Sequence, residues 1–430
     1  MIKEFGKIGA SSWLLKKGRV IDPAQNRDEQ ADVLISDGKI IAIGAGLTDS
    51  RAQVVDCREL WVVPGLIDVH CHLRDPGFEH KETMESGTKA AARGGFTTIV
   101  AMANVNPVPD NLNTYYKIQK LIEKKAVIRV IQAASVTKDL KGRDLSDMAS
   151  LVAAGVKIFT DDGQYIERAS VLYQALHLAN KLDAVVMLHE EDTSLKLYWP
   201  TAYEPVNETA AIARDLEILR ATGGKLHFQH LSTAKSVELI RRAKKAGLCV
   251  TAEVCPHHLT LSVDEISCYG TNAKMAPPLR TILDQEALIQ GLNDGTIDFI
   301  ATDHAPHALD DKNVPFDLAA NGIVGLETAL PVLLTKLVHG RGLSPAWLIK
   351  RMSYLPAKIF GLPGGTLTVG SEADICVIDP RVKWKIDSSR FLSKGRNTPY
   401  HGTRVQGDVR FTFVGGRKVY SGLESLSYLY

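Results

Sequence analysis

The middle of the chain alternates between short apolar runs and segments with helical periodicity. The runs are almost continuously hydrophobic, which is typical of parallel strands buried on both faces. The segments between them, such as 170–176 and 234–240, repeat apolar residues at helical spacing. Eight alternating units predict an α/β protein with a TIM-like (β/α)8 barrel. The predicted strands are the run that ends at Val69 and the runs 97–102, 127–131, 156–159, 184–188, 225–229, 249–254 and 299–302.

The two ends of the chain differ from its middle. Residues from about 12 to 63 form short strand-like runs separated by turn signals such as Asp37-Gly38, and the runs 373–380 and 409–420 have the same character. Neither end has enough apolar surface to stand alone. We therefore expect both ends to build one small β-sandwich domain. The expected organisation is 1–63 for the first part of the sandwich, 64–362 for a metal-dependent barrel and 363–430 for the second part.

Size and charge exclude several classes of protein. The chain has 430 residues, 45% of them hydrophobic, and a net charge of +2, so a large core is expected and a nucleic-acid partner is not. No apolar stretch is long enough to span a membrane, and the N-terminus lacks the apolar run of a signal peptide. The six cysteines have no paired spacing and are expected to be reduced thiols. These features predict a cytoplasmic location.

Residues of metal-ligand type follow the ends of five predicted strands. In a barrel, functional residues lie at the C-terminal ends of the strands. Side chains two apart on a strand point to the same face, so one pair of histidines would project together. Nitrogen and oxygen donors without thiolates suit zinc or a similar divalent ion. The candidate ligands are His70 and His72 after the first run, Asp161 and Asp162 after the fourth, His189 after the fifth, His230 after the sixth and Asp303 after the eighth.

This set of donors exceeds what one tetrahedral ion needs. Two ions that share a bridging carboxylate would use the surplus, and a water held between two cations would be a hydroxide near neutral pH. The predicted reaction class is therefore hydrolysis of a carbonyl or phosphoryl bond.

Several motifs together resemble those of the bacterial type I dihydroorotases of the amidohydrolase superfamily. The resemblance extends from about Trp13 to Tyr420. The motifs are Pro64–His72, His72–Gly77, Lys89–Thr98, Phe159–Gly163, Thr251–Leu259, Ala301–His307 and Asn397–Tyr400.

The resemblance implies the zinc-dependent, reversible hydrolysis of (S)-dihydroorotate to N-carbamoyl-L-aspartate in de novo pyrimidine (UMP) synthesis. A metal-bridging hydroxide would attack the ring amide carbonyl. Asp303 would be the general acid/base, taking a proton from this nucleophile and giving it to the leaving nitrogen.

The resemblance also implies a set of ligands for one or two zinc ions, of which two are expected. His70, His72 and Asp303 would hold one ion, and His189 and His230 the other. Asp162 is the expected bridging carboxylate, while Asp161 and a carboxylated Lys157 stay open as alternatives.

Substrate contacts are likewise implied by the resemblance. The guanidinium of Arg74 offers paired donors that match a substrate carboxylate. Ala276 stands where the family usually has asparagine, and Asn321 where an aromatic residue usually precedes glycine, so the substrate is either held by other donors or is a related cyclic amide. Glu190 replaces the usual cysteine after His189. The expected substrate-binding residues are His72, Arg74, Asn104, Ala276, His307, Asn321 and Gly322.

Two alternative functions stay open from the sequence. One is a cyclic amidase of the hydantoinase or allantoinase kind. The other is an inactive, dihydroorotase-like structural partner of aspartate carbamoyltransferase, although the retained histidines favour an enzyme. A homodimer and an association with that carbamoyltransferase also stay open. The adjacent His257 and His258, and His227, are expected to have structural roles only.

Overall fold

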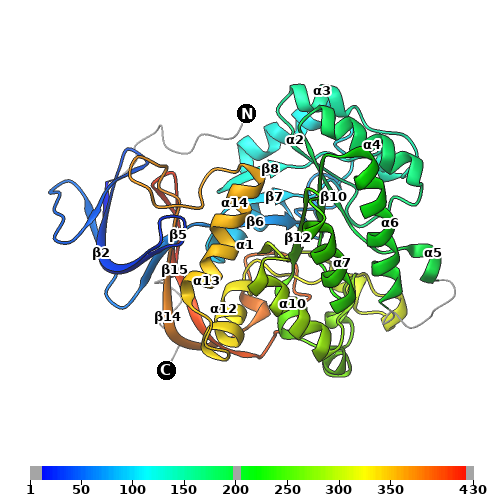
Figure 1. Cartoon of the computed structure of the whole chain (residues 1–430). Helices are drawn as coiled ribbons and strands as arrows, with labels where there is room; N and C mark the ends of the chain where they lie inside the picture. Colours follow the sequence, from blue (N-terminus) through cyan, green and yellow to red (C-terminus); the bar gives the residue numbers. More distant parts are fainter. Residues whose placement is uncertain (1–11, 197–204, 423–430) are drawn as a thin grey trace.

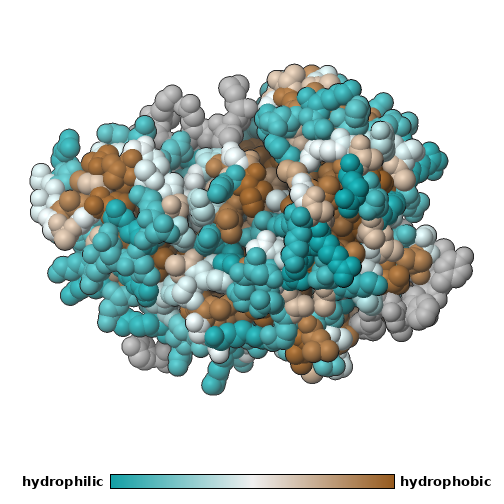
Figure 2. All heavy atoms as spheres, in the orientation of Figure 1, coloured by the Kyte–Doolittle hydropathy of each residue, from teal (hydrophilic) through white to brown (hydrophobic). Residues whose placement is uncertain are grey.

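The computed structural model describes residues 12–196 and 205–422, and it contains a sheet-rich unit beside a larger unit of strands and helices (Figure 1). Hydrophilic residues cover most of the face in Figure 2, and apolar groups appear there in small separate patches. No helix among the described residues is both long and apolar enough to cross a membrane. All six cysteines are free, as expected from their spacing.

The sheet-rich unit is one connected sheet of eight strands, in the order β16-β15-β14-β5-β1-β2-β3 with β4 beside β1. Its strands are β1 (Trp13–Asp22), β2 (Arg27–Ser36), β3 (Lys39–Gly44), β4 (Gln53–Asp56), β5 (Trp61–Pro64), β14 (Ile375–Lys385), β15 (Arg404–Val414) and β16 (Arg417–Ser421). β14 runs antiparallel to β5, with Ile375 opposite Pro64. Strands from the two ends of the chain therefore lie side by side.

The larger unit contains two wholly parallel sheets, ordered β6-β7-β8 and β13-β12-β11-β10-β9. Their strands are β6 (Leu66–Cys71), β7 (Phe96–Ala101), β8 (Arg129–Gln132), β9 (Ile158–Thr160), β10 (Val185–Leu188), β11 (Lys225–Phe228), β12 (Val250–Val254) and β13 (Phe299–Ile300). Each strand overlaps one of the eight predicted apolar runs. Isolated parallel bridges join the two sheets at both edges, between Cys71 and His304 and between Ala134 and Phe159.

Helices lie between these strands and after the last of them. They are α1 (Met84–Arg93), α2 (Leu112–Lys125), α3 (Met148–Ala153), α4 (Ala169–Lys181), α5 (Thr193–Lys196), α6 (Val206–Thr222), α7 (Ala234–Lys245), α8 (Pro256–Thr260), α9 (Ile266–Tyr269), α10 (Ile282–Asp294), α11 (Leu309–Lys312), α12 (Ala329–Leu333), α13 (Pro345–Ile349) and α14 (Leu355–Phe360). Shorter 3-10 or π-helical turns lie at Lys138–Leu140, Val263–Glu265, Gly270–Ala273, Phe316–Leu318, Leu334–His339, Lys350–Tyr354 and Ser388–Arg390. Side-chain caps start several helices; Thr83, for example, accepts a hydrogen bond from the amide of Ser86 at the start of α1.

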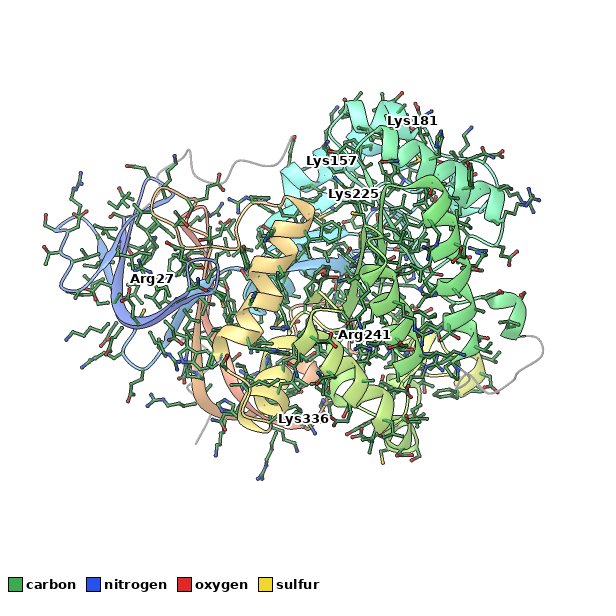
Figure 3. All side chains as sticks on the ribbon, in the orientation of Figure 1. Arg27, Lys157, Lys181, Lys225, Arg241 and Lys336 are labelled. Atoms are coloured by element: carbon green, nitrogen blue, oxygen red, sulfur yellow. The ribbon has the colours of Figure 1, made fainter. Side chains whose placement is uncertain are left out.

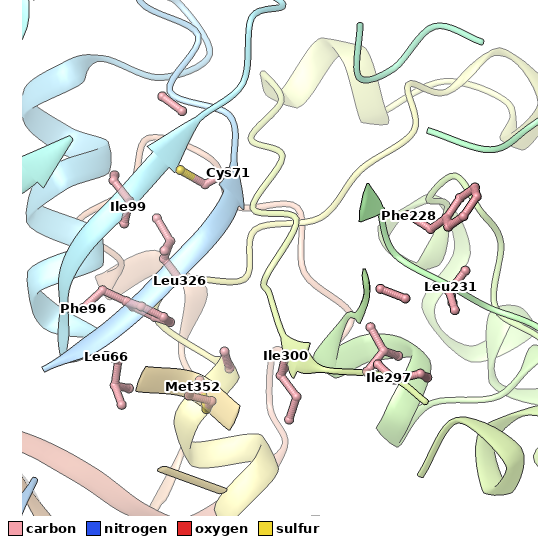
Figure 4. Packing of buried hydrophobic residues seen from close by; sticks show 14 of the residues in the cluster. Leu66, Cys71, Phe96, Ile99, Phe228, Leu231, Ile297, Ile300, Leu326 and Met352 are labelled. Atoms are coloured by element: carbon pink, nitrogen blue, oxygen red, sulfur yellow. The ribbon is translucent and has the colours of Figure 1, made fainter. Parts of the chain in front are cut away.

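Buried apolar residues of both parallel sheets belong to one large core cluster (Figure 4), and a second, smaller cluster takes other residues of the same strands. Phe96 and Ile99 of β7 belong to the large cluster together with Phe228 of β11 and Ile300 of β13, and all are almost fully buried. This packing fixes the strands relative to one another, so the residues that follow them are held on a rigid frame.

Candidate metal centre and substrate cavity

The six predicted ligands come together at the C-terminal ends of the parallel strands. The last residues of β6 include His70, and each of the others follows a strand: His72 after β6, Asp162 after β9, His189 after β10, His230 after β11 and Asp303 after β13. All six side chains are buried. Nε2 of His72 lies 3.0 Å from Oδ1 of Asp303, and Nδ1 of His189 lies 2.9 Å from Nε2 of His230.

Asp162 stands at the middle of this cluster. Its carboxylate lies 3.3 Å from Nε2 of His70, 3.3 Å from Nε2 of His72 and 3.6 Å from Nε2 of His230. Two groups of donor atoms, each within 4.8 Å of one another, share it: one with His70 and His72, and one with His189 and His230. Oδ1 of Asp162 is buried without a hydrogen-bond partner, an atom that a bound cation would satisfy. The donor set therefore fits metal ions.

The electrostatics of the cluster agree with its donor chemistry. Burial by itself would raise the pKa of Asp162, but the surrounding imidazoles, that of His70 above all, hold this pKa well below its usual range. The pKa of Asp303 is likewise lowered, against burial, by His70 and His72. Burial acts to lower the pKa of His70, yet the carboxylates around it raise this pKa overall. Ionised carboxylates thus concentrate negative charge where a cation would bind.

The two alternative bridging residues lie elsewhere. Asp161 accepts hydrogen bonds from the backbone amides of Val136 and Thr137, at 2.8 Å and 3.0 Å, and from the Thr137 hydroxyl, so it holds a neighbouring loop. Lys157 is exposed directly before the first residue of β9, at the same end of the parallel strands as Lys225, which starts β11 (Figure 3). This is the opposite end of the parallel strands from the histidine cluster.

Three of the histidines are oriented by polar groups behind them. Nδ1 of His70 donates to Glu253 in β12 at 2.6 Å, and Nδ1 of His72 donates to the side-chain oxygen of Asn104 at 2.8 Å. Nε2 of His189 lies 3.4 Å from Glu191. Such partners leave the other ring nitrogen free to face the centre and strengthen it as a metal ligand.

Sequence reasoning did not find Glu253 or the role of His227. Nε2 of His227 donates to the second oxygen of Glu253 at 3.1 Å, while Nδ1 accepts from the Thr251 hydroxyl at 2.8 Å. Both residues lie inside apolar strands. A charged or polar residue within such an apolar run was the one sequence signal that could have indicated a buried polar contact. The resulting buried chain holds Glu253 ionised, and its pKa is lowered to about 2 despite burial, chiefly by His70 and His227.

A cavity of about 270 Å³ opens beside the cluster, a volume that suits one small ring with its substituents. It is lined by all seven residues expected to bind substrate, by five of the six predicted ligands, and by Tyr165, Glu191, Gly163 and Ala305, which were not among the expected site residues. The lining residues from the predicted sets are His72, Arg74, Asn104, Asp162, His189, His230, Ala276, Asp303, His307, Asn321 and Gly322.

Two lining side chains also have partners within the protein. Nε of Arg74 donates to the carbonyl oxygen of Pro306 at 3.4 Å, and Nε2 of His307 donates to the carbonyl oxygen of Asn321 at 2.7 Å. Burial and the nearby Arg74 lower the pKa of His307 to about 3, so its imidazole is neutral at physiological pH. Within the part of the chain that the structure describes, Arg74 is the one arginine or lysine that lines this cavity.

Comparison with known proteins supports the same chemistry. Residues 60–236 match the model of a family described as dihydro-orotase-like. A dihydroorotase from Clostridioides difficile (strain 630) is 44% identical over 421 residues, which cover 95% of this chain and 99% of that protein. A dihydroorotase from Syntrophotalea carbinolica is 43% identical, over 95% of this chain and 98% of that protein.

Solved structures of cyclic amidases share the fold. An L-hydantoinase (dihydropyrimidinase) from Arthrobacter aurescens superimposes with a TM-score of 0.86 at 28% identity, covering 95% of this chain and 96% of that one. A dihydropyrimidinase from Brevibacillus agri NCHU1002 gives a TM-score of 0.84 at 26% identity, with 95% of both chains covered. With a relative 44% identical along nearly the whole of both chains, and with the motifs and cluster described above, the chain belongs to the dihydroorotase family.

Proposed function

We propose that this chain is a metal-dependent cyclic amidohydrolase that interconverts (S)-dihydroorotate and N-carbamoyl-L-aspartate in pyrimidine synthesis. The observation that carries the proposal is the pair of buried donor groups that share Asp162, in a chain 44% identical to a dihydroorotase. The hydantoinase-like structures share the fold at lower identity, so they favour the alternative substrates less.

The donor set suits two Zn²⁺ ions. His70, His72 and Asp303 would hold one ion, His189 and His230 the other, and Asp162 would contact both. When bound, the ions would supply Lewis-acid polarisation of the substrate carbonyl and acidify a water molecule.

Asp303 is the group placed to move a proton. It lines the cavity, and its lowered pKa keeps it ionised, so it can accept a proton at Oδ1 or Oδ2 from the attacking water. The water oxygen bonds to the ring amide carbon, the C–N bond of the ring breaks, and Asp303 returns the proton to the leaving nitrogen. The reverse sequence closes the ring.

Arg74 is the anchor for the substrate carboxylate. Its side chain is half-buried in the cavity wall, where fewer water molecules compete for its donors than in open solvent. Asn104 contributes through its amide, while its oxygen holds His72. Ala276 and Asn321 line the same space, so any contact at those two positions comes from the backbone or from the Asn321 amide.

We further infer that the two parallel sheets form one (β/α)8 barrel, since bridges join them at both edges. The barrel would comprise 64–362. Residues 1–63 and 363–430 would form the β-sandwich. A homodimer and a complex with aspartate carbamoyltransferase stay predictions. Gel filtration of this protein alone would test the first, and gel filtration of its mixture with that enzyme would test the second.

The test is an assay of purified, zinc-loaded protein with dihydroorotate, hydantoin and allantoin. We expect turnover of dihydroorotate, at least a thousandfold loss in Asp303→Asn, and no loss in the matched surface change Asp310→Asn. Turnover of hydantoin without dihydroorotate would replace the proposal by the cyclic-amidase alternative. Protein that binds no zinc and turns over none of the three substrates would support the structural alternative.

A further inference from the structure

A second cluster of metal-ligand residues follows β12. Cys255 ends the strand segment, and His257 and His258 lie in the first turn of α8. Each residue offers one donor atom, and the three atoms lie within 4.8 Å of one another. The side chains are only 0%, 2% and 3% exposed, respectively. None of the three belongs to the histidine and aspartate centre described above.

The two imidazoles have nitrogen atoms without partners. Nε2 of His258 lies 3.0 Å from the carbonyl oxygen of Pro277, so this nitrogen carries the proton and donates it. Nδ1 of the same ring therefore has a free lone pair, and it is buried without a hydrogen-bond partner. Nε2 of His257 is also buried and unpartnered. Because buried polar atoms are nearly always satisfied, two such atoms on adjacent residues indicate a missing ligand.

The arrangement around His258 is the one that prepares an imidazole to bind a metal. A carbonyl group that accepts from one ring nitrogen fixes the tautomer and turns the other nitrogen to the ion. Burial lowers the pKa of His257 to about 4, and it lowers that of His258 as well, so both rings are neutral and can donate lone pairs. The ring centroids are 4.4 Å apart.

Cys255 adds a soft donor. Its thiol is free and fully buried. Burial raises the pKa of Cys255, so the sulfur carries its proton when no cation is bound. A divalent cation bonded to the sulfur stabilises the thiolate that burial alone disfavours.

We propose that Cys255, His257 and His258 form an additional metal site that takes a thiophilic divalent ion of the Zn²⁺ class. A sulfur atom with two imidazole nitrogens is a donor set typical of zinc. On binding, the Sγ–H bond of Cys255 breaks, its proton passes to solvent, and a sulfur–metal bond forms. The alternative occupant is a buried water molecule that bridges the two free nitrogens, which involves no bond to sulfur.

Cobalt is the probe that separates these occupants, because thiolate ligation to Co²⁺ produces a charge-transfer band and the histidine and aspartate centre has no thiol ligand. The protein would be produced in cells supplied with cobalt, so that buried sites fill as the chain folds. Its exposed thiols would be removed by C249S and C268S. We expect the charge-transfer band in this parent protein. Cys255→Ser should lose the band and should bind one cobalt ion fewer per chain. The buried control Cys376→Ser should keep both the band and the full cobalt content.

X-ray absorption of the cobalt-loaded, otherwise unaltered chain tests the same point without a change at Cys255. We expect sulfur in the cobalt coordination shell, at roughly the 2.3 Å typical of metal–thiolate bonds. Absence of both sulfur and the band, or a band that persists in Cys255→Ser, would overturn the proposal. Turnover of dihydroorotate, recorded in parallel, shows whether the histidine and aspartate centre is intact and so separates the two proposals.

Discussion

Three residues of the site have positive φ angles, a backbone conformation that residues other than glycine rarely adopt. The φ angles are +59° at Arg74, +33° at His230 and +48° at Asp303. Positive φ is uncommon outside glycine and costs free energy that the rest of the fold must offset. At a strand end it turns the following chain sharply, which lets one rim hold side chains from several strands at such short range.

The hydrogen bond between His70 and Glu253 leads to a prediction about metal affinity. Glu253→Gln keeps the shape of the side chain but removes the charge that polarises the His70 ring. We expect metal affinity to fall roughly 10- to 100-fold, as for other polar partners of metal ligands. Competition with a chromogenic chelator would measure it.

The matched control is Glu286→Gln, which removes one exposed carboxylate that pairs with Arg341. It should leave metal affinity unchanged. Equal affinity in Glu253→Gln and the unaltered chain would show that Glu253 does not tune the centre.

Arg74 gives a second prediction at this scale. Arg74→Lys keeps a positive charge but loses the planar fork that matches a carboxylate. A charge-assisted hydrogen bond contributes about 1.5–3 kcal/mol, so we expect kcat/KM for dihydroorotate to fall by roughly 10- to 100-fold, mainly through KM. Steady-state kinetics would show it, with exposed Arg390→Lys as the control. An unchanged KM would remove Arg74 from the substrate site.

Among the elements, the junction between α1 and β7 depends on a close backbone approach. Gly94 ends α1, and a Cβ atom there would lie 2.0 Å from the carbonyl oxygen of Leu326. Its φ of −79° is open to any residue, so space alone demands glycine. The contact ties the start of β7 to the segment after β13.

We therefore expect Gly94→Ala to lower the free energy of unfolding by about 1–3 kcal/mol, the usual cost of overpacking. Urea denaturation would measure this change. Gly44, at the end of β3, has open space where a Cβ would be and supplies the control Gly44→Ala. Similar stability of the two variants would contradict the close approach.

The elements also show how far sequence reasoning can reach. Continuous apolar runs predicted all eight parallel strands, and the residues after them predicted which side chains gather at one rim, because strand ends share one rim whatever the details of packing. Asp162 as the bridging ligand stays a prediction, but the sequence could not show that Asp161 instead accepts from the amides of Val136 and Thr137. Glu253 was not predicted because its hydrogen-bond partner, His70, lies on a strand distant in sequence. A side-chain contact between two such strands leaves no local pattern in the sequence.

At the scale of the whole molecule, a buried cation connects the parallel sheets to the unit built from the chain ends. Arg129 of β8 forms ion pairs with Glu372 and with Asp374, which precedes β14. Asp374 is buried and also accepts from the amide of Gly415 at 2.8 Å. The Arg129–Asp374 pair is therefore a charged contact between the two units that is shielded from water, while Glu372 stays exposed.

Arg129→Met should destabilise the whole chain, because it leaves the Asp374 carboxylate buried without its cation. Breaking a buried pair in this way costs about 3–5 kcal/mol. Urea denaturation monitored by circular dichroism would show one transition, with its midpoint at a lower urea concentration than in the unaltered chain. The control Arg417→Met changes an exposed residue and should leave this midpoint unchanged. An unmoved midpoint in Arg129→Met would mean that the pair contributes nothing to stability.

The pairing of β5 with β14 also has a consequence for how the chain is made. Residues 61–64 pair with β1 early, but they cannot pair with β14 until residues 375–378 have left the ribosome. β6, which carries His70, begins directly after β5. A nascent chain must therefore wait through the synthesis of most of its length before β5, the strand that leads into β6, is paired on both sides, and such long-range closure makes folding slow and dependent on protection from aggregation.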